Sequence, residues 1–312
     1  MTVRYWNKKV LLAKIESAYG TDPTLTGAAN AILATNISLR PMDGEDVKRD
    51  LEKPYLGNSA AFPTGLRAVI TFDTELAGSG VAGTAPAWGV LARGVGMAEV
   101  IVASTSVTYN PISASFESLY IKLNIDGVLH AIKGARGTAE ITLNAQGIPI
   151  IRWTFTGLFV APTDAAAATP TFTAFIDPLL ATTTNTPTFT INSVALALKS
   201  LSFKLNNQVE PRFYIRHEEV LIVDRKETLD VTVEAPLLAT FNPFSLAAAR
   251  TQVAASIVHG TVAGSIATLT AATSQIMRPE SIGNSQNIVE YSSLKLLPIP
   301  SSGNDQFTLA LT

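Results

Sequence analysis

Leu119-Tyr-Ile-Lys-Leu-Asn-Ile125, Asp126-Gly127 and Val128-Leu-His-Ala-Ile132 make up the stretch that decides the fold most clearly. Two short runs rich in β-branched and apolar residues flank an Asp-Gly pair, which supplies the two positive φ angles of a type I′ turn. The stretch therefore predicts a β-hairpin. Just beyond it, residues 140–144 and 150–159 predict a second antiparallel pair across Gln146-Gly147.

A period of two dominates the rest of the chain, whereas helical signals are few. From residue 68 to residue 76, mostly apolar side chains at even positions alternate with a more polar set at odd positions, as in a half-buried strand. Residues 201–205 and 229–235 are expected to be further strands. A short helix is predicted over 85–93, with Pro86 near its start, and another over 243–250, with Asn242 as its cap.

The order of these predicted elements occurs twice, which indicates a duplicated unit. Each half has a strand, a charged segment, a second strand, a short helix, a hairpin or further strands, and a final strand pair. This final pair is expected to end at residues 153–157 in the first half and at residues 306–310 in the second. Placing Glu75 on Glu234 aligns the two polar faces and puts Asp73 on Thr232 and Thr71 on Asp230. We therefore predict a mainly β chain of two tandem, related β-sandwich or half-barrel modules, each with one short flanking α-helix. The first module spans 1–165, a linker rich in Ala, Thr and Pro spans 166–187, and the second module spans 188–312.

The composition restricts the function more than it identifies it. Only 15% of the 312 residues are charged, which is low for a soluble globular chain. This indicates either a surface largely covered by partners or a sandwich with an outer face rich in Thr and Ser. A net charge of −2 provides no basic field for gripping nucleic acid, and the absence of cysteine excludes disulfides and thiolate metal sites. We expect no secretory signal, no spanning helix and no membrane partner.

No set of residues predicts catalysis, and we expect neither enzymatic activity nor a cofactor. Gly78-Ser-Gly80-Val-Ala-Gly83 matches a dinucleotide-binding pattern, but the following helix is expected to begin only near Pro86. The three histidines are too scattered to form a helical metal pair. Gly134-Ala-Arg-Gly137 could hold an anion, although a glycine-flanked turn with one basic side chain explains it more simply.

Several stretches of the sequence occur in a characteristic order: 5–9 through 14–23, 49–57, 72–78, 126–130 and 134–138. With these stretches the chain resembles the major tail tube proteins of tailed bacteriophages, particularly those with long non-contractile tails. The resemblance covers most of residues 1–160 and, more loosely, the second half. It implies a virion protein, made in the host cytoplasm, whose modules join side by side so that their inner sheets form a continuous barrel around a channel.

In such a tube six modules close a ring, rings stack, and a long loop between early strands reaches the neighbouring ring. The implied partners are further copies of the chain, other tail proteins at the tube ends, and the tape measure protein and DNA transiently in the lumen. Because this chain has two modules, we expect three chains rather than six to close a ring with pseudo-sixfold symmetry.

Two sets of residues are candidates for roles in the tube. If the aligned strands face the lumen, acidic side chains there would repel DNA phosphates, and the alternative is a polar outer face of the sandwich. The candidate lumen residues are Thr71, Asp73, Glu75, Asp230, Thr232 and Glu234. Two segments of mixed charge are candidate ring-stacking loops, with Asp43, Glu45, Asp46, Lys48, Arg49, Asp50, Glu52 and Lys53 in the first and Glu210, Arg212, Arg216, Glu218 and Glu219 in the second.

Two other classes of protein stay open from the sequence. One is a different virion component, such as a tail terminator, a sheath or a decoration protein. The other is a small-molecule-binding β-sandwich, which the lack of convergent His, Asp and Ser residues disfavours.

Overall fold

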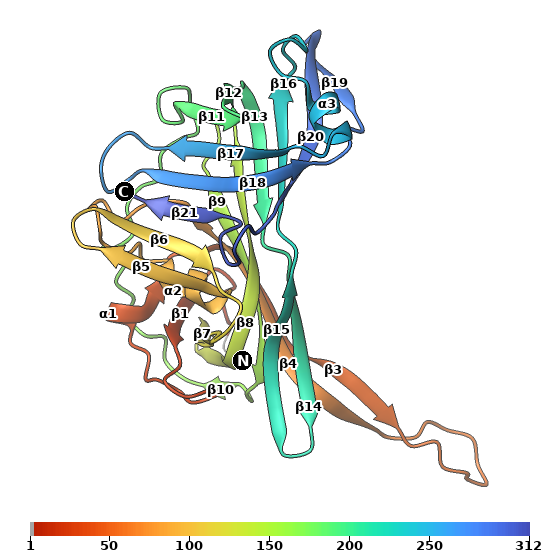
Figure 1. Ribbon diagram of the computed structural model, residues 1–312. Helices are drawn as coiled ribbons and strands as arrows, with labels where there is room; N and C mark the ends of the chain where they lie inside the picture. The colour runs from red at the N-terminus through yellow and green to blue at the C-terminus, as the bar shows by residue number, and fades with distance from the viewer. Residues whose placement is uncertain (1–2) are drawn as a thin grey trace.

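A long antiparallel sheet forms one layer of the molecule (Figure 1). The computed structural model describes residues 3–312. The order of strands across this long sheet is β3 (Thr35–Lys48), β4 (Ala61–Glu75), β9 (Ile150–Phe159), β8 (Val128–Asn144), β13 (Leu198–Lys204), β16 (Thr228–Glu234), β20 (Ile288–Pro298) and β19 (Ile282–Ser285).

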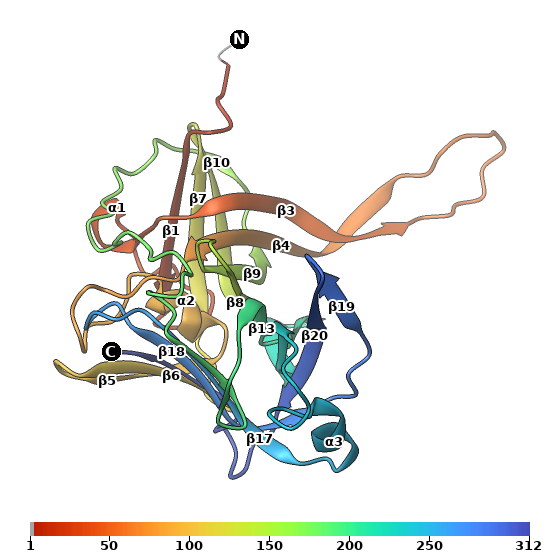
Figure 2. The same cartoon turned by 90° about the horizontal axis from the view of Figure 1, so that it is seen from above.

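A second layer packs against one face of the long sheet, as the view from above shows (Figure 2). The order of its strands is β5 (Met97–Val102), β6 (Ser106–Pro111), β21 (Thr308–Leu311), β18 (Ala267–Ile276), β17 (Gln252–His259), β11 (Thr188–Ile191) and β12 (Val194–Ala195). The end of β18 also pairs with β20, which joins the two layers. The predicted mainly β sandwich is confirmed.

Smaller strands extend from the first half of β8. They are β7 (Leu119–Ile125), β1 (Lys9–Ile15) and β2 (Ala31–Ile32), while the short β10 (Thr163–Asp164) pairs with β8 directly. The β7–β8 pair is the hairpin predicted from the Asp-Gly turn: Ile125 faces Val128, and Asp126 and Gly127 have φ angles of 43° and 92°.

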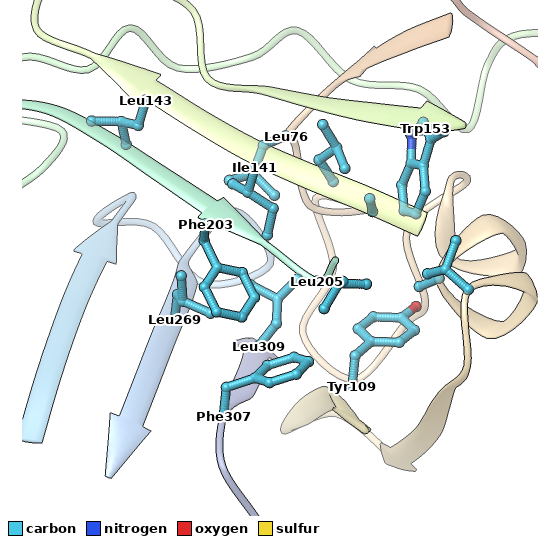
Figure 3. Close-up of a cluster of buried hydrophobic side chains, with 14 of the residues drawn as sticks. Leu76, Tyr109, Ile141, Leu143, Trp153, Phe203, Leu205, Leu269, Phe307 and Leu309 are labelled. Atoms are coloured by element: carbon cyan, nitrogen blue, oxygen red, sulfur yellow. The ribbon is translucent and has the colours of Figure 1, made fainter. Parts of the chain in front are cut away.

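The core lies between the two layers and is built from both halves of the chain (Figure 3). Trp153 and Phe203 of the long sheet meet Tyr109 and Leu309 of the second layer and Phe307, which precedes β21. The rings of Phe203 and Phe307 pack edge to face with their centroids 4.9 Å apart. Each fully buried side chain of this size contributes about 1.5–3 kcal/mol through the hydrophobic effect, so this cluster ties the halves together strongly.

The helices are short and flank the sandwich. The first predicted helix is α2 (Gly89–Gly94), which begins later than expected because the residues before it form turns. The second is α3 (Pro243–Ala248), where the side chain of Asn242 accepts a hydrogen bond from the backbone N–H of Ser245 as predicted. A four-residue helix, α1 (Gly27–Asn30), was not expected from the sequence.

The strand order of the first half of the long sheet repeats in the second half. Elements of the first half match elements of the second half in chain order. The match pairs β3 with β13, β4 with β16 and α2 with α3, and an arm follows β3 and β13 in each case. It also pairs the β5–β6 hairpin with the β17–β18 hairpin and the β8–β9 hairpin with the β19–β20 hairpin. The expected match for the last pair was wrong in one respect, because residues 308–311 do not join the long sheet. They form β21, which lies in the second layer between β6 and β18. The module boundaries at 165 and 188 stay a prediction.

The two charged segments are arms rather than loops (Figure 1). In the first arm, β3 continues to Lys48 and β4 begins at Ala61, so only residues 49–60 are irregular. The second arm is a hairpin of β14 (Asn207–Tyr214) and β15 (His217–Arg225), with Arg216 at a φ of 71° in its turn. Antiparallel pairing satisfies the backbone of both arms, which is why segments this polar still form strands.

Candidate functional site: the polar face of the long sheet and the arms

The candidate lumen residues lie on one face of the long sheet. On β4 and β16 the residues that point to the core are buried, including Ile70, Phe72, Val231 and Val233. The candidates occupy the alternate positions, so their side chains lie on the face opposite the core. The strands between β4 and β16 bring the two sets into one continuous surface, which we call the polar face.

Cross-strand register shows how the two sets are related. Glu75 faces Ile150, Ile150 faces Thr142, Thr142 faces Ser202 and Ser202 faces Asp230, so one row crosses five strands from one candidate to another. The row crosses the junction between β8 and β13, where the two halves of the chain meet. The face is therefore shared by both halves without a break.

A neighbouring row carries charges of alternating sign. Asp73 faces Arg152, Arg152 faces Glu140, and Glu140 faces Lys204. The Arg152 guanidinium donates to both carboxylate oxygens of Asp73, at 2.9 and 3.1 Å, and Lys204 Nζ lies 3.6 Å from Glu140 Oε1. This row of the polar face thus pairs its charges, and the face is not uniformly acidic.

Asp73 is the one candidate of this set whose carboxylate is covered by its ion-pair partner. Its side chain is only 1% exposed, because Arg152 covers it and the Asn36 amide also donates to it at 2.8 Å. Burial by itself would raise the pKa of Asp73, but the hydrogen bonds from Arg152 and Asn36 outweigh it and lower the pKa below the ordinary value. The lumen role of all six candidates, Thr71, Asp73, Glu75, Asp230, Thr232 and Glu234, stays a prediction, and Asp73 would take part in it as one member of an ion pair.

The second arm is anchored to the first half of the chain by Arg136, which is buried in β8. Its guanidinium donates to Glu219 Oε1 at 2.9 Å, to the Val220 carbonyl at 2.7 Å and to the Phe116 carbonyl at 2.9 Å. On the same strand, β15, the Val220 N–H donates to the Tyr19 hydroxyl at 2.6 Å. The arm is consequently held against its own chain along β8 and β9.

The anchoring involves Glu219, whose expected role in ring stacking stays a prediction. Burial alone would raise the pKa of Glu219, but the hydrogen bonds from Arg136 and His217 have the larger effect, so the pKa lies below the ordinary value. The carboxylate is therefore charged and paired within its own chain. The other candidate stacking residues lie where a second molecule could reach them, and their role stays a prediction. They are Asp43, Glu45, Asp46 and Lys48 on β3, Arg49, Asp50, Glu52 and Lys53 in the connecting loop, and Glu210, Arg212, Arg216 and Glu218 on the second arm.

Several charged residues of the polar face were missed in the sequence. They include Arg152, Glu140 and Lys204, and also Lys295 and Glu290 of β20, which face Asp230 and Glu234. The alternation of β9 could have revealed Arg152, because it stands between the core residues Ile151 and Trp153. The buried state of Arg136 had no comparable signal, since its partners come from residues far away in the chain.

The glycine-rich segment 78–83 serves packing. The Gly80 N–H donates to the Gly264 carbonyl at 2.9 Å, and a Cβ on Gly78 would lie 2.1 Å from that carbonyl oxygen. The segment therefore joins the first half to a turn of the second. Within residues 3–312 no group of three or more His, Asp and Glu residues is arranged to hold a metal ion, and no helix there is long and apolar enough to cross a membrane.

The fold is a two-layer β-sandwich, and its most prominent surface features are the polar face of the long sheet and the two projecting arms. Comparison with protein families identifies which class this is: the family described as phage tail tube protein matches residues 6–303. The chain belongs to this family and is accordingly a structural component of the phage virion. The comparison with curated proteins gave no match.

Proposed function

We propose that the chain is the repeating subunit of a tail tube that polymerises into stacked rings and acts without enzymatic activity. The observation that carries the proposal is the repeated strand order of the long sheet, in which β3-β4-β9-β8 is followed side by side by β13-β16-β20-β19. Each chain then supplies two adjacent modules to a ring. Three chains would supply six modules and close the ring with pseudo-sixfold symmetry.

The polar face is proposed to line the lumen, because the opposite face of the long sheet is already covered by the second layer. Paired charges, together with Thr and Ser side chains, would give DNA and the tape measure protein a hydrated wall with little net positive charge. A protein that neutralises few phosphates releases few counterions and binds DNA weakly, so the duplex would pass without sticking. The arms would contact adjacent rings, and other tail proteins would close the tube ends.

Assembly of the purified protein tests the ring. We expect tubes in negative-stain micrographs at high protein concentration, and image averaging should show three chains in each ring. Rings of six chains would contradict the trimer, and a protein that stays monomeric at every concentration would contradict polymerisation.

The direction of the polar face can be tested separately with cysteine labelling, since the native chain has no cysteine. Thr232→Cys on the polar face and Thr270→Cys on the outward face of β18 form a matched pair at half-buried threonines. In tubes, a bulky maleimide should label Thr270→Cys but not Thr232→Cys, while both react in the free chain. Equal labelling of the two variants in tubes would contradict a lumen position.

A further inference from the structure

The long sheet ends in two strands that each pair on one side only. Within residues 3–312, β3 pairs with β4 alone, and β19 pairs with β20 alone. Open sheet edges of this kind are ready to pair with another chain. In the repeat, β3 corresponds to β13 and β19 corresponds to β8, and inside the chain β8 and β13 are paired with each other.

We propose that the contact between neighbouring chains copies this internal β8–β13 junction residue by residue, with β19 of one chain pairing with β3 of the next. The proposal rests on the proposed function and adds the register of the contact. The partner is a second copy of this chain, joined head to tail.

The register of β3 follows from its partner on β4. Ser38 faces Thr71, and Ser202 faces Asp230, which is aligned with Thr71. Ser38 therefore takes the place of Ser202, Leu39 that of Phe203, and Arg40 that of Lys204. Both strands also have a β-bulge near their start, between Thr35 and Ser38 in β3 and between Leu198 and Ser200 in β13.

The register of β19 follows in the same way from the other edge. Glu75 faces Ile150, which faces Thr142, while Glu234 faces Glu290, which faces Gly283. Gly283 therefore takes the place of Thr142 and Ile282 that of Ile141. Because Ser202 faces Thr142 and Phe203 faces Ile141 inside the chain, Ser38 should face Gly283 and Leu39 should face Ile282 between chains.

Side-chain exposure supports this pairing. Ile141 is 6% exposed in the internal junction, where Phe203 lies opposite, whereas Ile282 at the open edge is 62% exposed. Ile282 faces the buried Tyr291, so it lies on the core side of the sheet, and Leu39 also packs on the core side of β3. Leu39 of a neighbouring chain would cover Ile282 as Phe203 covers Ile141.

The polar side of the junction has a counterpart in position but not in charge. Lys204 faces Glu140 inside the chain, and the same register places Arg40 opposite Ser281 of the neighbour. Arg40 and Ser281 are both exposed, so substitutions there remove no core packing. The pair therefore offers a test that does not depend on the stability of the core.

Disulfide cross-linking tests the register, and the native chain has no cysteine that could form other disulfides. Tubes of Leu39→Cys/Ile282→Cys and of Arg40→Cys/Ser281→Cys should give covalent dimers and trimers on non-reducing gels after mild oxidation. Mixed tubes of the single variants Arg40→Cys and Ser281→Cys should give heterodimers, which proves that the link joins two chains. Ser202→Cys/Thr142→Cys is the positive control for the internal junction, and Leu39→Cys/Asn284→Cys, displaced by two residues, is the negative control.

The outcomes separate the two proposals. Tubes in which the displaced pair cross-links and the predicted pairs do not would overturn the register while leaving the tube function intact. Tubes in which the positive control forms its disulfide but no pair between chains does would overturn the β3–β19 contact itself. A wild-type chain that forms no tubes would overturn the proposed function and, with it, this inference.

Discussion

Arg136 offers the sharpest test of how the second arm is held. Its side chain is 9% exposed and donates within 2.9 Å to one carboxylate and two backbone carbonyls, with a longer bond of 3.4 Å to the Glu117 carbonyl. Arg136→Met preserves much of the apolar packing but leaves Glu219 without its main partner and the two carbonyls unpaired. Removing one member of a buried ion pair costs about 3–5 kcal/mol, and we expect a loss of unfolding free energy in that range.

Urea unfolding followed by tryptophan fluorescence measures this loss, because Trp88 and Trp153 are buried in the core. Arg278→Met is the matched control: Arg278 is 83% exposed and lies 2.6 Å from the equally accessible Glu280. Such a surface pair is worth about 0–1 kcal/mol. We therefore expect Arg278→Met to lose less unfolding free energy than Arg136→Met, although the Arg278–Glu280 distance is the shorter of the two. Hydrogen exchange over residues 209–222 should rise in Arg136→Met only. A loss below about 1 kcal/mol for Arg136→Met would refute the anchoring role.

Three other outcomes are expected from single residues. The pKa of Asp73 is lowered in the folded chain, so its ion pair contributes fully to stability above the ordinary pKa of 3.8, and this contribution is lost as the pH falls below that value. Asp73→Asn should therefore flatten the decline of the urea midpoint between about pH 5 and pH 3. An unchanged decline would contradict this. Phe307→Ala should destabilise the chain by about 3–5 kcal/mol in the same assay, because it empties the site against Phe203; a cost under about 1 kcal/mol would argue against tight packing there. Asn242→Ala should cost about 0.5–2 kcal/mol through loss of the cap of α3, whereas Asn242→Asp should be close to neutral, and equal effects of the two would exclude capping as the cause.

Local chemistry made several elements predictable. The Asp-Gly turn set the β7–β8 hairpin, and alternation on β4 and β16 separated the core side from the polar side. The cap at Asn242 marked the start of α3. Each of these features depends on residues that are neighbours in the chain, where steric and hydrogen-bonding preferences act directly.

Contacts between strands that are far apart in the chain could not be predicted from the sequence. Asp73 looked like an exposed acid because its partner Arg152 lies on another strand, and only the β4–β9 register brings them together. The arms looked like loops because their charged residues hide the strand pattern. β21 was matched to the final strand pair of the first half, but its pairing with β6 and β18, which are distant in sequence, places it in the second layer.

The position of β21 has a consequence for folding order. β6 is synthesised early, yet one of its two edges is completed only by β21, near residue 309. Until then the second layer has a gap between β6 and β18, and pairings so distant in sequence form slowly. During this interval the exposed edges can bind the wrong strand, so the nascent chain is at its most aggregation-prone before β21 docks. Because β21 pairs with β6 of the first half and β18 of the second, the second layer is complete only in a subunit whose two halves have already packed together.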